Sequence, residues 1–183
     1  MSQPDTKQRI LSASEHHFAR DGYHATSLRS ITATARVNLA AVNYHFGSKE
    51  ALLEAVIERR LSPLNESRLA QLETLLHQAE QIGELPACRD ILRTFIEPTL
   101  HLRQQGSGSE NYITLIGRIL AEPRGIAMSI FMHHMQPLME RLFQALTLSL
   151  PTLSRETPSW RIPFAIGSSC YISGCPSRSA IGQ

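Results

Sequence analysis

The segment of residues 26–50, TSLRSITATARVNLAAVNYHFGSKE, constrains the fold most, because its pattern predicts two short helices hinged by a tight turn. Thr26 and Ser27 are suited to cap the first helix, and the pair Val37-Asn38 breaks it. The inner face of this first helix is expected to consist of Leu28, Ile31 and Ala35. The end of the segment is capped again, so a further helix should begin there.

The second short helix separates an apolar side from a side of small and polar residues. The residues expected to point inward at helical spacing are Leu39, Val42 and Phe46. Those expected to face outward are Ala40, Ala41, Asn43, Tyr44 and His45. Small residues let a backbone approach a groove closely, Tyr and His offer donors to phosphate, and Asn can pair with the edge of adenine. The pattern is therefore typical of a helix-turn-helix unit that reads DNA.

The same residues resemble the N-terminal domain of the TetR family of transcriptional repressors over roughly residues 7–60. In the family's order they are Arg9-Ile10-Leu11, Ala13, Phe18, Gly22-Tyr23, Thr26-Ser27, Tyr44-His45-Phe46, Gly47-Ser48-Lys49-Glu50 and Ala51-Leu52-Leu53. The run VNLAAVNYHFGSKEAL also resembles the sub-branch around the fatty-acid-responsive repressor PsrA and the branch of the repressor CecR.

The resemblance implies an all-α fold with a three-helix DNA-binding head and a helical regulatory and dimerisation domain. It implies a transcriptional repressor that binds a palindromic operator in double-stranded DNA as a homodimer and is released by a small apolar or amphipathic effector. We expect the head to be residues 1–47 and the second domain to be residues 48–183. Residues 151–183 are atypical for the family's long last helix, because they contain four prolines and three glycines.

The expected DNA contacts fall into two groups. The phosphate contacts are Thr26, Ser27, Tyr44, His45 and Lys49. The base-edge contacts are Ala40, Ala41 and Asn43, and the expected DNA-binding set also includes Arg29 and Leu39. The whole excess of positive charge lies in residues 1–60, which hold eight Lys or Arg and six Asp or Glu, whereas residues 61–183 hold ten of each. This footprint is weak, so binding should depend on dimerisation and geometry.

Helical periodicity predicts the remaining elements. Helices are expected at about residues 5–21, from Ser48 to the interruption at Pro63, and at 64–82, 88–103, 111–121 and 125–150, with a flexible loop at 104–110. The last helix carries a wide apolar face that comprises Met128, Phe131, Met132, Met135, Leu138, Met139, Leu142, Phe143 and Leu146. This face can be core, a helix–helix interface between subunits or the wall of an apolar cavity.

An elongated apolar effector with one polar end, such as a fatty acid or its acyl thioester, would suit such a cavity. The candidate ligand-binding residues are Leu100, Ile116, Met128, Met132 and Met135. Arg118 and Glu122, spaced i,i+4, are interpreted as a helix-surface pair.

Other classes of function find little support in the sequence. Neighbouring His133 and His134 point to different helix faces, and no nucleotide-binding or hydrolase motif occurs, so no metal, cofactor or catalysis is expected. A polar N-terminus, the absence of a membrane-length apolar run and three cysteines without zinc spacing predict a cytoplasmic protein that has no membrane partner. A regulator without a small-molecule effector, or a helical enzyme, stays the alternative.

Overall fold

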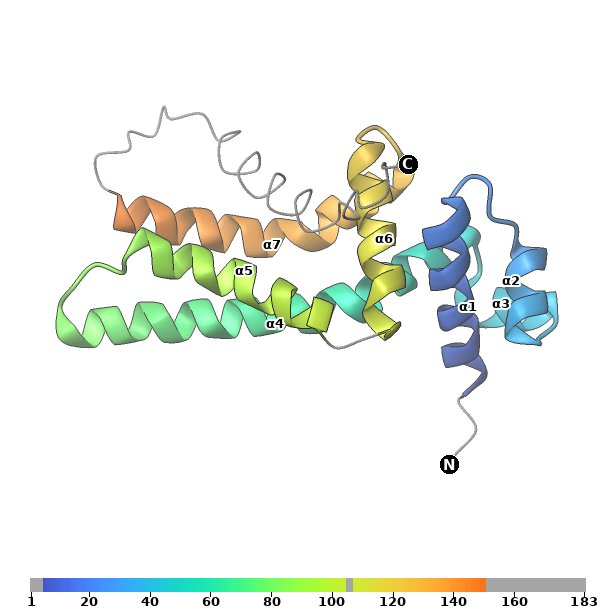
Figure 1. Ribbon diagram of the computed structural model, residues 1–183, viewed down its shortest axis with the longest axis horizontal. Coiled ribbons are helices and arrows are strands. Elements are labelled where there is room, and N and C mark those ends of the chain that lie inside the picture. The colour runs from blue at the N-terminus through green and yellow to red at the C-terminus, as the bar shows by residue number, and fades with distance from the viewer. Residues whose placement is uncertain (1–4, 105–106, 151–183) are drawn as a thin grey trace, which may run out of the picture.

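The computed structural model describes residues 5–104 and 107–150, and this part of the chain contains seven helices and no strand. The helices are α1 (Thr6–Asp21), α2 (Leu28–Ala35), α3 (Leu39–Phe46), α4 (Lys49–Ile82), α5 (Cys88–Gln104), α6 (Ser107–Ala121) and α7 (Ile126–Ser149). In Figure 1, α4, α5 and α7 lie along the length of the molecule, and α1 with α2 and α3 lies at one end of it. The prediction of an all-α fold is confirmed.

The head consists of α1, α2 and α3 packed on the first turns of α4. Its core holds the fully or almost fully buried side chains of Ile10, Phe18, Ile31, Val42, Leu52, Leu53, Val56 and Ile57. Four of these eight come from α4, so the head encloses its apolar core only together with a helix that continues into the rest of the protein. The domain boundary between residues 47 and 48 stays a prediction.

The body consists of α5, α6 and α7 with the rest of α4. Its core includes Leu72, Ile91, Leu115, Ile119, Leu138 and Leu142. Polar contacts tie these helices as well: the Asn65 amide donates to the carbonyl of His134 at 3.1 Å, and the buried Arg68 Nε donates to that of Phe95 at 3.1 Å. No helix in the described ranges carries an apolar stretch long enough to cross a bilayer.

A buried carboxylate joins α1 to α4. Glu15 is 3% exposed, and its Oε2 accepts from Arg59 Nη2 at 2.5 Å and from Arg60 Nε at 3.2 Å. Arg59 Nη1 also donates to the hydroxyl of Ser12 at 3.2 Å. Because these hydrogen bonds are directional, they fix how α1 is turned against α4, which apolar packing alone does less strictly.

Helix boundaries agree with the predicted signals except at two places. Gly22 and Gly83 end α1 and α4 with positive φ, and Ser48 caps α4 by accepting the Ala51 N–H at 3.0 Å. The predicted end at Pro63 is wrong: α4 runs through this exposed proline, whose missing N–H removes a single backbone hydrogen bond.

The loop predicted at residues 104–110 is too long. Gln104 still belongs to α5, and α6 begins at Ser107 with an acidic residue in its first turn, which the helix dipole favours. Residues 105 and 106, the atypical segment 151–183 and two of the three cysteines lie outside the described residues; the third, Cys88, is a half-buried free thiol.

Candidate nucleic-acid interface

The N-terminus of α2 is held by reciprocal contacts between its cap and first turn. Ser27 Oγ accepts the Ser30 N–H at 3.1 Å, and the Ser30 hydroxyl donates back to the Ser27 carbonyl at 2.7 Å. Thr26 is buried, and its hydroxyl lies within hydrogen-bond distance of the His17 and Gly22 carbonyls at 3.1 and 2.7 Å. The exposed hydroxyl at this helix start is therefore that of Ser27, while that of Thr26 is engaged within the head.

The turn between α2 and α3 is compact. Arg36 ends α2 in the left-handed conformation, with φ at 54°, and Asn38 begins α3 by accepting the Ala41 N–H on its side-chain oxygen at 2.8 Å. The sequence indicated the break at Val37-Asn38 but did not indicate the positive φ at Arg36, because an arginine carries no signal for that conformation. The helix-turn-helix arrangement is present as predicted.

The exposed side of α3 holds most of the predicted base-contact residues. Ala40 and Asn43 are exposed, and so is Tyr44, of which 86% is accessible to solvent. Ala41 and His45 are half-buried rather than fully outward. The prediction that Leu39 points inward is wrong, because this first residue of the helix is 44% exposed and side chains at a helix start tilt past its end.

Lys49, at the start of α4, is tied to the turn that precedes α2. Its Nζ lies 3.4 Å from the carbonyl oxygen of His24 and 4.5 Å from the centre of the Tyr23 ring. Partial burial lowers the pKa of Lys49, and burial raises the pKa of Tyr23. Arg29, on the first turn of α2, is exposed.

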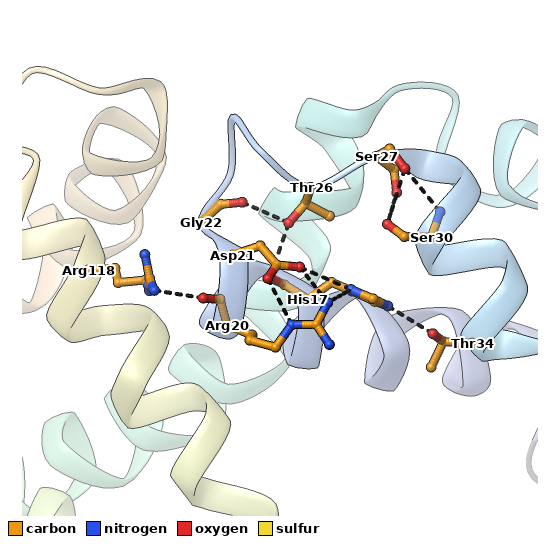
Figure 2. A network of polar contacts seen from close by, with 9 residues as sticks. All are labelled: His17, Arg20, Asp21, Gly22, Thr26, Ser27, Ser30, Thr34 and Arg118. Atoms are coloured by element: carbon orange, nitrogen blue, oxygen red, sulfur yellow. Dashed lines mark hydrogen bonds and ion pairs between the residues drawn. The ribbon is translucent and has the colours of Figure 1, made fainter.

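A polar network that the sequence did not predict lies at the end of α1 (Figure 2). Arg20 donates two hydrogen bonds of 2.8 Å to the Asp21 carboxylate. The His17 ring lies between Asp21, at 3.3 Å, and the Thr34 hydroxyl of α2, at 2.8 Å. The hydrogen bonds from Arg20, assisted by His17, hold the pKa of Asp21 at about 2, below its ordinary 3.8.

The five candidate ligand-binding residues come from three helices of the body and differ in burial. Met135 lies in the core, Ile116 and Met128 are partly buried against it, and Leu100 and Met132 are exposed. A separate open groove of about 510 Å³ lies between α4 and α5 and is lined mainly by polar residues, among them Gln71, Asp90 and Arg93. Among the described side chains, no group of three or more His, Cys, Asp or Glu could hold a metal ion.

Two protein families match this chain, one over the head and one over the body. A family described as "Bacterial regulatory proteins, tetR family" matches residues 10–56, and one described as "Tetracyclin repressor-like, C-terminal domain" matches residues 93–180. The regulator UidR of Escherichia coli K12 is 36% identical over 65 residues, 33% of each chain. HbdR of Aromatoleum sp. is 26% identical over 78 residues, 43% of this chain and 34% of that protein. The matched part thus spans about a third of the length of these curated relatives.

Solved structures share the fold along nearly the whole chain. A HlyIIR mutant protein has a TM-score of 0.61 at 21% identity and covers 96% of this chain and 92% of its own. The TetR family regulator PfmR from Thermus thermophilus has a TM-score of 0.60 at 22% identity, with coverage of 96% and 89%. At these low sequence identities, the similarity shows a shared fold and nothing about function.

A capped helix-turn-helix in a three-helix head, joined to a helical body, defines a protein of the helix-turn-helix class. The two family matches cover the head and the body in turn and together span more than half of the sequence. The chain belongs to the TetR family of helix-turn-helix transcriptional regulators.

The lowered pKa of Asp21 predicts a specific acid sensitivity. A carboxylate whose pKa is depressed in the folded state stabilises that state above its unfolded pKa of 3.8 and loses this contribution as the pH falls to about 2. Asp21→Asn should therefore lower the free energy of unfolding at neutral pH, and the difference from wild type should shrink between these two pH values. Denaturant titrations over this range measure it, with exposed Glu58→Gln on α4 as control. A difference that does not change with pH would contradict the prediction.

Proposed function

We propose that this protein is a cytoplasmic repressor that binds a palindromic operator in double-stranded DNA as a two-fold homodimer and is released by a small apolar or amphipathic effector. The exposed face of α3, with Asn43 and Tyr44 beside Ala40, carries the proposal. The small side chain of Ala40 lets the helix backbone enter a major groove, and the amide of Asn43 can pair with the edge of adenine. The family of the chain and its relatives support this function.

The two kinds of DNA contact come from different elements. Ala40, Ala41 and Asn43 meet base edges from α3, with exposed Leu39 beside them. Ser27 and Arg29 at the start of α2, Tyr44 and His45 on α3, and Lys49 at the start of α4 hold phosphates. Thr26 supports this surface from within the head, because its buried hydroxyl bonds to the His17 and Gly22 carbonyls and so holds the turn that precedes Ser27.

Phosphate and base contacts should separate in binding measurements. Operators are first selected from random duplexes with the full chain, and affinities are then measured over a series of salt concentrations. Lys49→Ala should weaken binding to every duplex, and it should reduce the slope of the logarithm of the binding constant against the logarithm of the salt concentration by about one unit. Asn43→Ala should instead relax the preference for one base, at a cost of about 1 to 3 kcal/mol in binding free energy. Arg124→Ala, an exposed cation of the body, is the control. Equal losses for both variants on operator and random DNA would refute the assignment.

The dimer is proposed to form through the outer side of α7. Met132 is 48% and Phe143 42% exposed, and they lie eleven residues apart on one line along the helix, with half-buried Met139 between them. Exposed apolar side chains aligned on one helix are typical of a subunit interface. A two-fold axis there can place two α3 helices one turn of DNA apart, roughly 34 to 36 Å, as a palindrome requires.

The dimer proposal predicts which residues of α7 affect assembly. Phe143→Asp should raise the dimer dissociation constant about thirtyfold, the equivalent of about 2 kcal/mol, since it places a charge in the apolar contact. Leu148→Asp is the control, because Leu148 is also exposed but lies about 140° round the helix. Leu142 is unsuitable: at 1% exposure it belongs to the protomer's own core. Analytical ultracentrifugation measures the dissociation constant of both variants. An unchanged dissociation constant for Phe143→Asp would show that the interface lies elsewhere.

The effector is proposed to be an elongated apolar molecule with one polar end, such as a fatty acid or its acyl thioester. The resemblance of the head to the PsrA and CecR branches supports it. So do the apolar side chains of Ile116 on α6 and of Met128 and Met135 on α7, which lie in the core or pack against it, because apolar walls suit an acyl chain better than a polar molecule. Leu100 and Met132 complete the candidate set.

Release of the operator should depend on acyl chain length. Each buried methylene adds about 0.8 kcal/mol, so the concentration that releases the operator should fall as the acyl chain lengthens until the proposed site is full. The effector must also favour the state that does not bind DNA, because equal affinity for both states shifts nothing. Fatty acids and acyl thioesters of increasing length are titrated against the complex, with a polar planar drug as control. Release by the drug alone would reject the lipid class, and no release by any compound would favour a regulator without such an effector.

A further inference from the structure

Arg118 of α6 makes a direct polar contact between the body and the head (Figure 2). Its Nη2 donates a hydrogen bond of 2.6 Å to the carbonyl oxygen of Arg20 in the last turn of α1. The two residues are 98 positions apart in the sequence. The sequence indicated that Arg118 pairs with Glu122 on the surface of its own helix. That interpretation is wrong, since the guanidinium bonds to a backbone carbonyl of another helix.

The end of α1 is suited to receive a guanidinium. The last carbonyls of a helix have no N–H partner within that helix, and they form the negative end of its dipole. Arg118 supplies a cationic donor to one of them. The chain turns away at Gly22, whose positive φ of 82° favours glycine, and a Cβ at this position would lie at an ordinary contact distance of 3.6 Å from Arg118 Nη1.

From this point hydrogen bonds continue to both ends of α2. The Arg20 side chain donates to Asp21, and the His17 ring links Asp21 to Thr34 in the last turn of α2. At the other end, the Thr26 hydroxyl contacts the carbonyls of His17 and Gly22, next to the cap of α2. The end of α1 is therefore hydrogen-bonded to Thr34 in the last turn of α2 and to Thr26 just before this helix.

Within the part of the chain that the structure describes, the body has two main attachments to the head. One is α4, which passes from the head into the body as a single helix, and the other is the packing of α1 on α6 that includes the Arg118 contact. A unit that is joined through one helix can swing about the helix axis. A second contact on a different helix removes that freedom.

We propose that Arg118 is a positioning residue that fixes the orientation of the head on the body, so that the two heads of a dimer keep the spacing that a palindrome requires. This inference rests on the proposed function. Arg118 touches no DNA; it acts through the carbonyl of Arg20.

The test compares a full palindrome with a duplex that holds one half-site, using the full-length chain and the sequence selected by the wild type. Arg118→Met keeps the apolar stem and removes the donors, and it should weaken binding to the palindrome about threefold to tenfold while half-site affinity stays unchanged. Arg118→Lys keeps a charged donor and should retain more palindrome affinity than Arg118→Met. Arg124→Met, the same substitution at an exposed arginine near the end of α6, should match the wild type.

Contrary results are well defined. Equal losses on the palindrome and the half-site would mean that Arg118 acts on the fold of the head, and no loss on either would mean that the contact does not hold its orientation; each overturns the proposal.

A second measurement needs no DNA. Hydrogen exchange of the free full-length chain should be faster at residues 20–36 in Arg118→Met and unchanged at 64–82 and 131–146; unchanged exchange at 20–36, or faster exchange everywhere, also overturns it. If the wild type selects no palindrome, the proposed function fails, while the exchange measurement still reports on the contact.

Discussion

The ion pairs of Glu15 with Arg59 and Arg60 hold together the two helices on which the rest of the structure depends. Glu15 lies on α1, which packs against α2, α4 and α6, and the arginines lie on α4, which runs through head and body. A carboxylate with this little exposure is tolerated only because both cations and their hydrogen bonds compensate for its lost hydration. Removal of the carboxylate would leave two partly buried cations close together, so the junction depends on a charge balance as well as on apolar burial.

The course of α4 explains why the α1–α6 contact matters. Up to Leu61 its buried residues complete the core of the head, and from Asn65 onward they belong to the body. Between them lies exposed Pro63, which lacks the N–H that an ordinary residue would give to the helix. The connection is thus weakest in backbone hydrogen bonds where packing changes from one part to the other. Contacts elsewhere, such as that of Arg118 with α1, then determine how the head is oriented.

Features that depend on neighbouring residues could be predicted from the sequence. Gly22, Ser48 and Gly83 mark helix ends because capping involves only a few positions along the chain. The prediction of a helix end at Pro63 failed because long-range packing on both sides outweighed a single lost hydrogen bond. The network of His17 and Arg118 could not be predicted at all. A buried histidine and a backbone carbonyl 98 residues from its donor give no periodic signal.

The apolar face of α7 shows how far periodicity alone can be interpreted. Helical spacing placed all nine residues on one wide face, and it could not separate core, cavity and interface. In the structure, Phe131, Met135, Leu138, Leu142 and Leu146 are buried within the protomer, while Met132 and Phe143 are exposed along the edge of that face. Met132 was expected in the effector site, but its exposure and its alignment with Phe143 fit the proposed dimer contact as well. A substitution at partly buried Met128 therefore tests effector binding more directly than one at Met132, because it leaves the line of exposed side chains intact.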